Sequence, residues 1–405
     1  MLDRSKRTAE ARGAARSPAT VALAGLVALA VAMGIGRFAF TPILPMMQED
    51  AGLSVAAGGW LASANYVGYL LGALSAMAIR VRAATAIRGG LVLIGVVTLG
   101  MGLEQRFAGW IALRALAGIA NGWVVVFAFS WCLEKLAAAR RPLLNGLVFA
   151  GVGTGIAVAG GFCLVLMQVN ASSGQAWMGL GVIALIATAV IWRIFGTGDG
   201  RRPAAHGRQW DADSLRLVLC FGATGFGYII PATFLPAMAR QLIPDPLVFG
   251  WSWPLFGAAA AVSTLAAAVL PSFLGNRSVW ILGQLVMALG VALPVFWPAI
   301  GGIMIAALLV GITFMVITMV AMQEARQVAG PHATGLIAAM TSAFAAGQIV
   351  GPISVSYVVG AGGDFSEALL AACVLLTVSA YALSRSRGAP RVRPSGPNKV
   401  LKNPG

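Results

Sequence analysis

The fold of this chain is decided by the stretch GIGRFAFTPILPMM, residues 34–47, which closes an apolar run that begins near Ala19. The run is about 28 residues long, more than the ~20 that an α-helix needs to cross a bilayer. Arg37 is therefore predicted to lie inside the membrane. A guanidinium keeps its proton there, so Arg37 must face either a water-filled cavity or an anionic partner, which marks it as a functional candidate. The alternative is a structural arginine that bonds to carbonyl groups at helix ends.

The same pattern returns near mid-chain as GFGYIIPATFLPAM, residues 225–238. The first glycines of the two stretches are 191 positions apart, and so are the second glycines and the later prolines. At the same offset, Gly59-Trp60 matches Gly250-Trp251. The chain therefore contains two similar membrane-embedded halves in the same orientation, an arrangement typical of secondary transporters.

Composition excludes a soluble globular protein. Of the 405 residues, 59% are apolar and only 10% are charged, and the mean hydropathy is +0.85. The net charge of +15 does not indicate nucleic-acid binding, because the basic residues fall in short loops and tails between apolar spans. The four cysteines and two histidines are scattered, so we expect no disulfide framework, no metal site and no cofactor.

Twelve apolar segments follow a polar start and predict twelve transmembrane helices. They lie at roughly 20–47, 54–79, 84–103, 107–132, 143–168, 175–195, 215–240, 248–273, 278–297, 299–322, 333–359 and 365–384. The predicted organisation is a tail at 1–18, an N-terminal six-helix bundle at 19–195, a linker at 196–213, a C-terminal six-helix bundle at 214–384 and a basic tail at 385–405.

The distribution of basic residues predicts the orientation. Of the 28 lysines and arginines, 24 fall in segments on one predicted side of the membrane and only two, Arg106 and Arg240, in loops on the other. The remaining two, Arg37 and Arg114, lie inside spans. Because basic loops stay on the cytoplasmic side, both termini are predicted to be cytoplasmic, in a multi-pass protein of the bacterial inner membrane.

The repeat, the twelve spans and the central linker resemble the major facilitator superfamily over residues 20–384. Within it, the opening stretch at 34–47, followed by GWLASANYVGYLLG at 59–72, resembles the YbfB/YjiJ family. The resemblance implies an all-α fold of two pseudo-symmetric bundles and a secondary transporter that works by alternating access. It supplies no substrate.

Other superfamily motifs are present in weakened form. Arg114, four residues before Gly118, resembles the fourth-helix motif, which supports a role for Arg114. The motif after the second helix is altered, because Ala76 stands where that motif has an aspartate. The fifth-helix antiporter pattern is also altered, with Ile156 in place of proline, so antiport is not inferred. The residues expected to act in cytoplasmic gating are Gly72, Arg80, Arg82, Glu134 and Glu324.

Counting along each span at 1.5 Å per residue places a set of polar side chains at a similar depth near mid-membrane. The predicted substrate-binding residues are Arg37, Asn65, Tyr66, Arg114, Asn121, Tyr228 and Gln348. The alternative is hydrogen bonding between packed helices for the amide side chains and plain packing for Tyr66. No acidic residue is predicted at this depth, so a cavity with two arginines would attract anions.

Three functions remain in competition. The first is transport of a small organic anion, and the second is efflux of hydrophobic or drug-like compounds. The third, a receptor or enzyme in the membrane, is disfavoured because the sequence shows no nucleophile, metal cluster or appended domain. The expected partners are a small-molecule substrate, the lipid bilayer and, as a candidate coupling ion, protons. We expect no nucleic acid and a monomeric chain.

Overall fold

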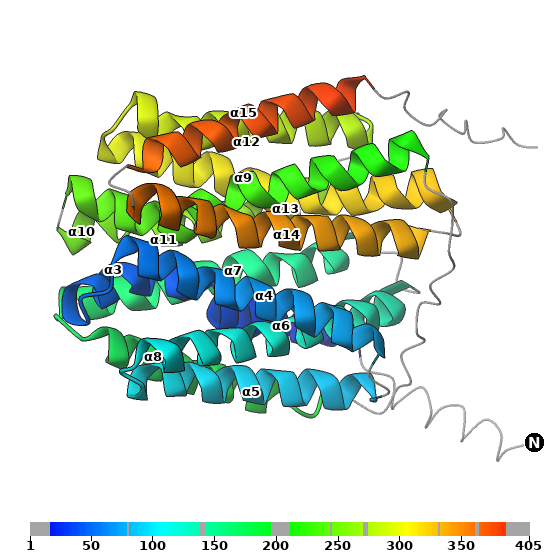
Figure 1. The fold of residues 1–405 in the computed structure, drawn as a ribbon. Helices are drawn as coiled ribbons and strands as arrows, with labels where there is room; N and C mark the ends of the chain where they lie inside the picture. The colour runs from blue at the N-terminus through cyan, green and yellow to red at the C-terminus, as the bar shows by residue number, and fades with distance from the viewer. Residues whose placement is uncertain are drawn as a thin grey trace, which may run out of the picture.

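The computed structural model describes residues 17–78, 81–137, 142–195, 211–243, 245–269, 274–330, 333–360 and 364–385. In these ranges the regular secondary structure is entirely helical, and the long helices run side by side along one direction (Figure 1). The predicted tails and most of the linker lie outside the described residues, as does Arg80.

The first half of the chain begins with a single long helix that changes its geometry twice. It consists of α2 (Pro18–Leu29), a π-helical segment η1 (Ala30–Phe38) and α3 (Phe40–Asp50). It is followed by α4 (Val55–Ala78), α5 (Ala83–Leu103), α6 (Phe107–Ala137), α7 (Pro142–Gln168) and α8 (Ser173–Ile191).

The second half repeats this series with a first helix that is α-helical throughout. It contains α9 (Ala212–Leu242), the short α10 (Pro246–Phe249), α11 (Ser252–Val269), α12 (Asn276–Phe296), α13 (Ile300–Ala329), α14 (Ala333–Gly360) and α15 (Phe365–Ser384). In Figure 1 the helices of the first half occupy the lower part of the molecule and those of the second half the upper part.

The described helices confirm the predicted fold class. Ten of them, with Pro18–Asp50 counted as one, are long and apolar enough to cross a membrane. Helices α4 and α11 occupy the second and eighth predicted spans, so each predicted span falls on a helix. Large apolar side chains such as Val190 and Phe296 are exposed at the surface, as a bilayer-facing surface allows. The chain is a multi-pass membrane protein.

Proline placement explains the change of geometry in the first helix. The π-helical segment ends at Phe38, four residues before Pro42. Because proline has no backbone N–H, the carbonyl of Phe38 lacks its usual α-helical donor. Wider π-helical turns are rare and often lie at functional sites. Arg37 lies in this segment, which the sequence analysis did not predict.

Glycines allow α4 and α6 to cross with their backbones in contact. A Cβ added to Gly68 would overlap the carbonyl oxygen of Ala115, and one added to Gly118 would overlap that of Asn65. Gly72, a predicted gating residue, packs in the same way against Ile119. This crossing brings the polar side chains of α4 and α6 close to the π-helical segment.

The two halves meet mainly through α4 against α14 and α7 against α11, which lie across the middle of the molecule (Figure 1). Both glycines of the repeated Gly-Trp pair lie at this interface. A Cβ at Gly59 would overlap Ser356 of α14, and one at Gly250 would overlap Leu164 of α7. The repeat seen in the sequence thus marks equivalent contacts between the halves.

Candidate functional site

Arg37 is buried between the two halves and is only 2% exposed. Its guanidinium carbon lies 4.6 Å from the ring centre of Tyr66, 4.8 Å from that of Tyr69 and 5.3 Å from that of Phe38. Such cation–π contacts compensate part of the cost of burying the charge. Within the described part of the chain, its Nε and Nη2 atoms have no hydrogen-bond partner.

Arg114 is equally buried, but its hydrogen-bonding groups are used. Nε donates to the carbonyl of Leu61 at 3.4 Å, Nη1 to that of Gly36 at 3.4 Å and Nη2 to that of Arg37 at 3.2 Å. Because Pro42 removes a backbone donor from this turn, Arg114 supplies donors to the π-helical segment from outside. Such a structural arrangement, with bonds to backbone carbonyls, was considered in the sequence analysis for Arg37 and not for Arg114. Direct contact of Arg114 with a substrate stays a prediction.

The predicted amide residues of the first half lie beside Arg114. The Nδ2 group of Asn65 donates to the carbonyls of Gly36 at 3.3 Å and Arg114 at 3.0 Å, so Asn65 ties α4 to the π-helical segment and to α6. Asn121 is fully buried, and its amide nitrogen and oxygen both lack a partner among the described residues. Asn121 therefore keeps unused hydrogen-bonding capacity inside the bundle.

The second half contributes a stack of aromatic rings. Tyr228 packs between Phe314, with ring centres 5.5 Å apart and 5° between planes, and Phe344, at 5.4 Å and 15°. The amide of Gln348 donates to the hydroxyl of Tyr228. Phe314 in turn lies against Phe38, the sequence neighbour of Arg37, with ring centres 6.4 Å apart. Tyr228 and Gln348 thus belong to the same region as Arg37.

Two contacts join the halves directly at this level. The hydroxyl of Tyr66 lies 3.2 Å from Oγ1 of Thr233, and the rings of Phe38 and Phe314 are 6.4 Å apart. The structure therefore brings four predicted residues into one region: Arg37, Tyr66, Tyr228 and Gln348. Arg114 and Asn65 support the backbone beside it.

Sequence reasoning did not select Tyr69, Thr233, Phe314 or Phe344. The spacing of Tyr66 and Tyr69, three residues apart, puts both rings on one helix face and could have identified Tyr69. Thr233 and the two phenylalanines carry no comparable signal, because apolar and small polar residues fill every span.

Comparison with known proteins agrees with this architecture. The family described as "Uncharacterised MFS-type transporter YbfB" matches residues 29–384. The chain belongs to this family. Among solved structures, it is similar to a mutant of the nucleoside transporter NupG, with a TM-score of 0.68 and 15% sequence identity over 90% of this chain and 99% of that one. At this identity the likeness shows a shared fold.

At the helix ends predicted to face the cytoplasm, one member of the predicted gating set of this YbfB-family chain, Glu324, forms an ion pair. Glu324 is buried and accepts a hydrogen bond from Nε of Arg277 at 2.6 Å, and Arg277 also pairs with Asp213. Arg277 and Asp213 were missed, although Arg277 stands next to the start of an apolar span. Arg82 is exposed before α5. The side chain of Glu134 lies outside what the structure describes.

At the opposite helix ends, predicted to face outward, α3 contacts α9. Arg240 donates from Nη1 to the carbonyl of Pro45 at 2.5 Å and forms an ion pair with Glu49 at 3.0 Å. Deeper in the protein, the hydroxyl of Thr41 donates to the carbonyl of Ala232 at 2.7 Å. Glu49 and Arg240 are 191 positions apart, as are Thr41 and Ala232. Equivalent positions of the two repeats therefore meet here.

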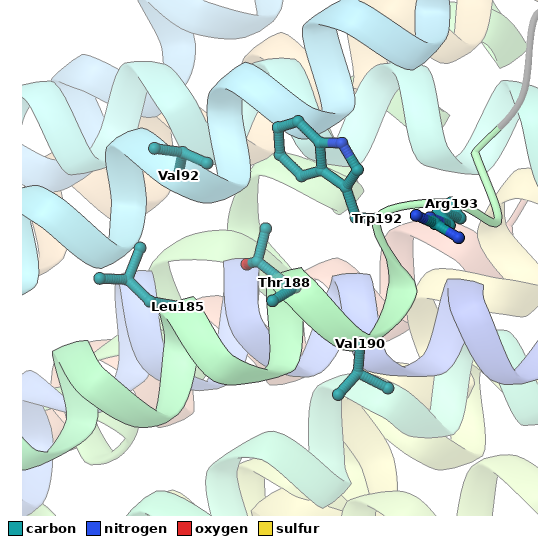
Figure 2. A pocket seen from close by; sticks show the side chains of 7 residues that line it. Val92, Leu185, Thr188, Val190, Trp192 and Arg193 are labelled. Atoms are coloured by element: carbon teal, nitrogen blue, oxygen red, sulfur yellow. The ribbon is translucent and has the colours of Figure 1, made fainter.

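A separate groove of about 440 Å³ lies on the surface of the first half, between α5 and α8 (Figure 2). Apolar side chains such as Val92 and Leu185 line it, and Trp192 and Arg193 lie toward one end. None of the residues around Arg37 lines this groove. It is a feature of the transporter's outer surface and not part of the candidate site.

Proposed function

We propose that this chain is a secondary transporter that moves a small organic anion by alternating access. The observation that carries the proposal is the state of the Arg37 side chain. Arg37 is only 2% exposed, and its guanidinium nitrogens Nε and Nη2 have no hydrogen-bond partner among the described residues. Among the described residues, no carboxylate forms an ion pair with it, and the sequence places no acidic residue at its depth.

A buried charge without a counter-charge is costly. The rings of Tyr66 and Tyr69 offset part of this cost, but they leave the N–H groups without acceptors. An anionic group of the substrate would supply both the missing charge and the missing acceptors. Arg114 then acts as a positioning residue, because its three bonds to carbonyls hold the backbone around Arg37.

The contacts between the halves support alternating access. The ion pair of Glu49 with Arg240 and the bond of Ser356 to the carbonyl of Ala56 hold the outward ends of the halves together. We infer that, in this conformation, the substrate reaches Arg37 from the cytoplasmic side. The proposal also places both termini in the cytoplasm, at the inner membrane of a bacterium, with a monomeric chain and with protons as a candidate coupling ion. It involves no chemical conversion of the substrate.

Flux measurements in proteoliposomes test the proposal. Uptake of labelled mono- and dicarboxylates is measured with and without a pH gradient, for the parent chain and for Arg37→Met, which keeps an unbranched side chain but removes the guanidinium and its charge. Arg106→Met, in an exposed outer loop, is the matched control. Saturable carboxylate uptake is expected in the parent and in Arg106→Met, and is expected to be lost in Arg37→Met at unchanged thermal stability.

Two results would overturn the proposal. In one, Arg37→Met retains saturable carboxylate uptake. In the other, the parent moves only neutral or cationic hydrophobic compounds, which the aromatic rings of Trp253 and Phe256 near Phe38 would favour. The second result would establish the efflux of hydrophobic or drug-like compounds instead.

A further inference from the structure

We infer that the transported anion is an aromatic monocarboxylate: one carboxylate, attached to a planar ring. The inference rests on the proposed function and names the substrate class of the same site. Three observations lead to it, namely which edge of Arg37 is unpartnered, how many guanidinium groups are available, and what surrounds them.

The unpartnered atoms of Arg37 are Nε and Nη2. The N–H bonds of these two nitrogens lie along the same edge of the planar guanidinium and point in nearly the same direction. Two parallel donors match the two oxygens of a carboxylate in a bidentate contact. A single hydroxyl or carbonyl oxygen would satisfy only one of them. The edge therefore favours a carboxylate over a neutral oxygen-bearing group.

Among the described residues, Arg37 is the one buried arginine with unpartnered guanidinium nitrogens. Arg114 directs Nε, Nη1 and Nη2 to three backbone carbonyls, and the ion pair of Arg277 with Glu324 lies near helix ends, away from Arg37. A second carboxylate on the substrate would enter the site without a counter-charge and would lose its hydration. The site therefore fits a monoanion better than a dicarboxylate.

The surroundings of Arg37 are aromatic on both sides of the interface. Rings of Tyr66 and Tyr69 cover the guanidinium, while Phe314, Tyr228 and Phe344 form a nearly parallel stack opposite. Phe314 and Phe344 are also stacked against Phe256 and Phe221, so a planar ring attached to the bound carboxylate would pack edge-to-face against this stack. A saturated ring of similar size cannot make this aromatic contact.

Most polar atoms of the tyrosines beside the stack are already engaged, and the unpartnered polar atom next to Tyr228 is Oε1 of Gln348. The Tyr228 hydroxyl is engaged by Gln348, and the Tyr66 hydroxyl by Thr233. A substrate that carries many hydroxyl groups besides its carboxylate, such as a sugar acid, would leave several of these hydroxyl groups without hydrogen-bond partners, which is unfavourable in a buried site. The part of the substrate attached to the carboxylate is therefore expected to be apolar and planar.

Binding to the purified full-length chain in detergent tests this inference with four probes: benzoate, cyclohexanecarboxylate, phthalate and benzamide. Relative to benzoate, cyclohexanecarboxylate lacks the planar ring, phthalate carries a second carboxylate and benzamide carries no charge. We expect benzoate to bind at least tenfold more tightly than cyclohexanecarboxylate and phthalate, and benzamide to show no saturable binding. Equal or tighter binding of the saturated ring or of the dicarboxylate would overturn the inference.

The result also separates this inference from the proposed function. Tight binding of phthalate or cyclohexanecarboxylate that Arg37→Met abolishes would refute the aromatic monocarboxylate and leave anion transport standing. Benzamide binding that equals benzoate binding and survives Arg37→Met would refute both.

A variant of Tyr69 tests the role of the ring faces. Tyr69→Leu keeps an apolar side chain but removes one ring from the guanidinium, and Tyr357→Leu, on an exposed tyrosine of α14, is the matched control. Tyr69→Leu is expected to weaken benzoate binding severalfold more than cyclohexanecarboxylate binding, with Tyr357→Leu unchanged. An equal loss of affinity for benzoate and cyclohexanecarboxylate would contradict aromatic contacts as the source of the selectivity for benzoate.

Discussion

Exchanging the charges of Glu49 and Arg240 tests whether the contact between α3 and α9 closes the outward end. The two residues occupy equivalent positions of the repeat, and Arg240 also donates to the carbonyl of Pro45, four residues before Glu49. By the same symmetry, an arginine at position 49 would face the carbonyl of Pro236, four residues before position 240. The exchanged pair should therefore rebuild the whole contact and not only the ion pair.

The two single substitutions should differ in size. The side chain of Glu49 is 74% exposed, so the ion pair itself contributes roughly 0–1 kcal/mol. The bond from the charged guanidinium to the carbonyl of Pro45 contributes about 1.5–3 kcal/mol. Arg240→Ala should thus reduce the free energy of closing the outward end by about 1.5–4 kcal/mol, whereas Glu49→Ala should reduce it by less than about 1 kcal/mol. A loss of about 2 kcal/mol changes the ratio of closed to open states roughly 30-fold.

Labelling of a buried cysteine from outside the cell measures the opening. Thr233→Cys places a thiol at a position that is 1% exposed, and a membrane-impermeant maleimide reaches it only when the outward end opens. The chain with its native cysteines alone gives the background. Arg240→Glu should raise the labelling rate strongly, and adding Glu49→Arg should return it close to that of the unexchanged chain.

Two outcomes would refute this reasoning. If the exchanged pair labels as fast as Arg240→Glu alone, the symmetry argument fails. If Glu49→Ala opens the protein as much as Arg240→Ala, the bond to Pro45 is not the main contribution.

Three further predictions concern packing, charge and orientation. Gly118→Ala should cost about 1–3 kcal/mol and lower the unfolding temperature, because its Cβ overlaps a backbone carbonyl, whereas Gly89→Ala, with open space around it, should not. Arg277→Met should cost about 3–5 kcal/mol, because it leaves the buried carboxylate of Glu324 without its ion pair, whereas Asp213 keeps Arg216 as a partner; adding Glu324→Gln should restore part of the lost thermal stability, and a further loss would contradict the ion-pair argument. Reporter fusions in the tail at 385–405 should report the cytoplasm, and a periplasmic signal would reverse the proposed orientation.

The spans were predictable because the bilayer imposes a constraint that acts along the sequence. Every crossing segment must be apolar and about as long as the membrane is thick, so hydropathy alone located the helices, including the break between α12 and α13 near Trp297. The repeat at 191 positions was visible because a side chain at Gly59 or Gly250 would overlap the other half of the chain, at Ser356 and Leu164 respectively.

The candidate site was only partly predictable. Arg37 stood out because a charge in an apolar run is conspicuous, but Arg114 is conspicuous for the same reason. What separates them is the position of the carbonyls of Gly36 and Arg37 relative to α6. Sequence spacing does not give the contact between two helices that are 77 residues apart. The pairing of Arg277 with Glu324, 47 residues apart, was missed for the same reason.

The contact between Glu49 and Arg240 also bears on how the two halves diverged. A duplicated gene begins with identical residues at equivalent positions, so the position now held by these two residues first faced a copy of itself. Two glutamates or two arginines there would have repelled each other, and a homodimer of single halves could never have placed opposite charges at that point. Only after a second copy of the sequence existed could one position change independently of its twin. The ion pair is therefore a product of divergence after duplication, and it arose later than the fold that it closes.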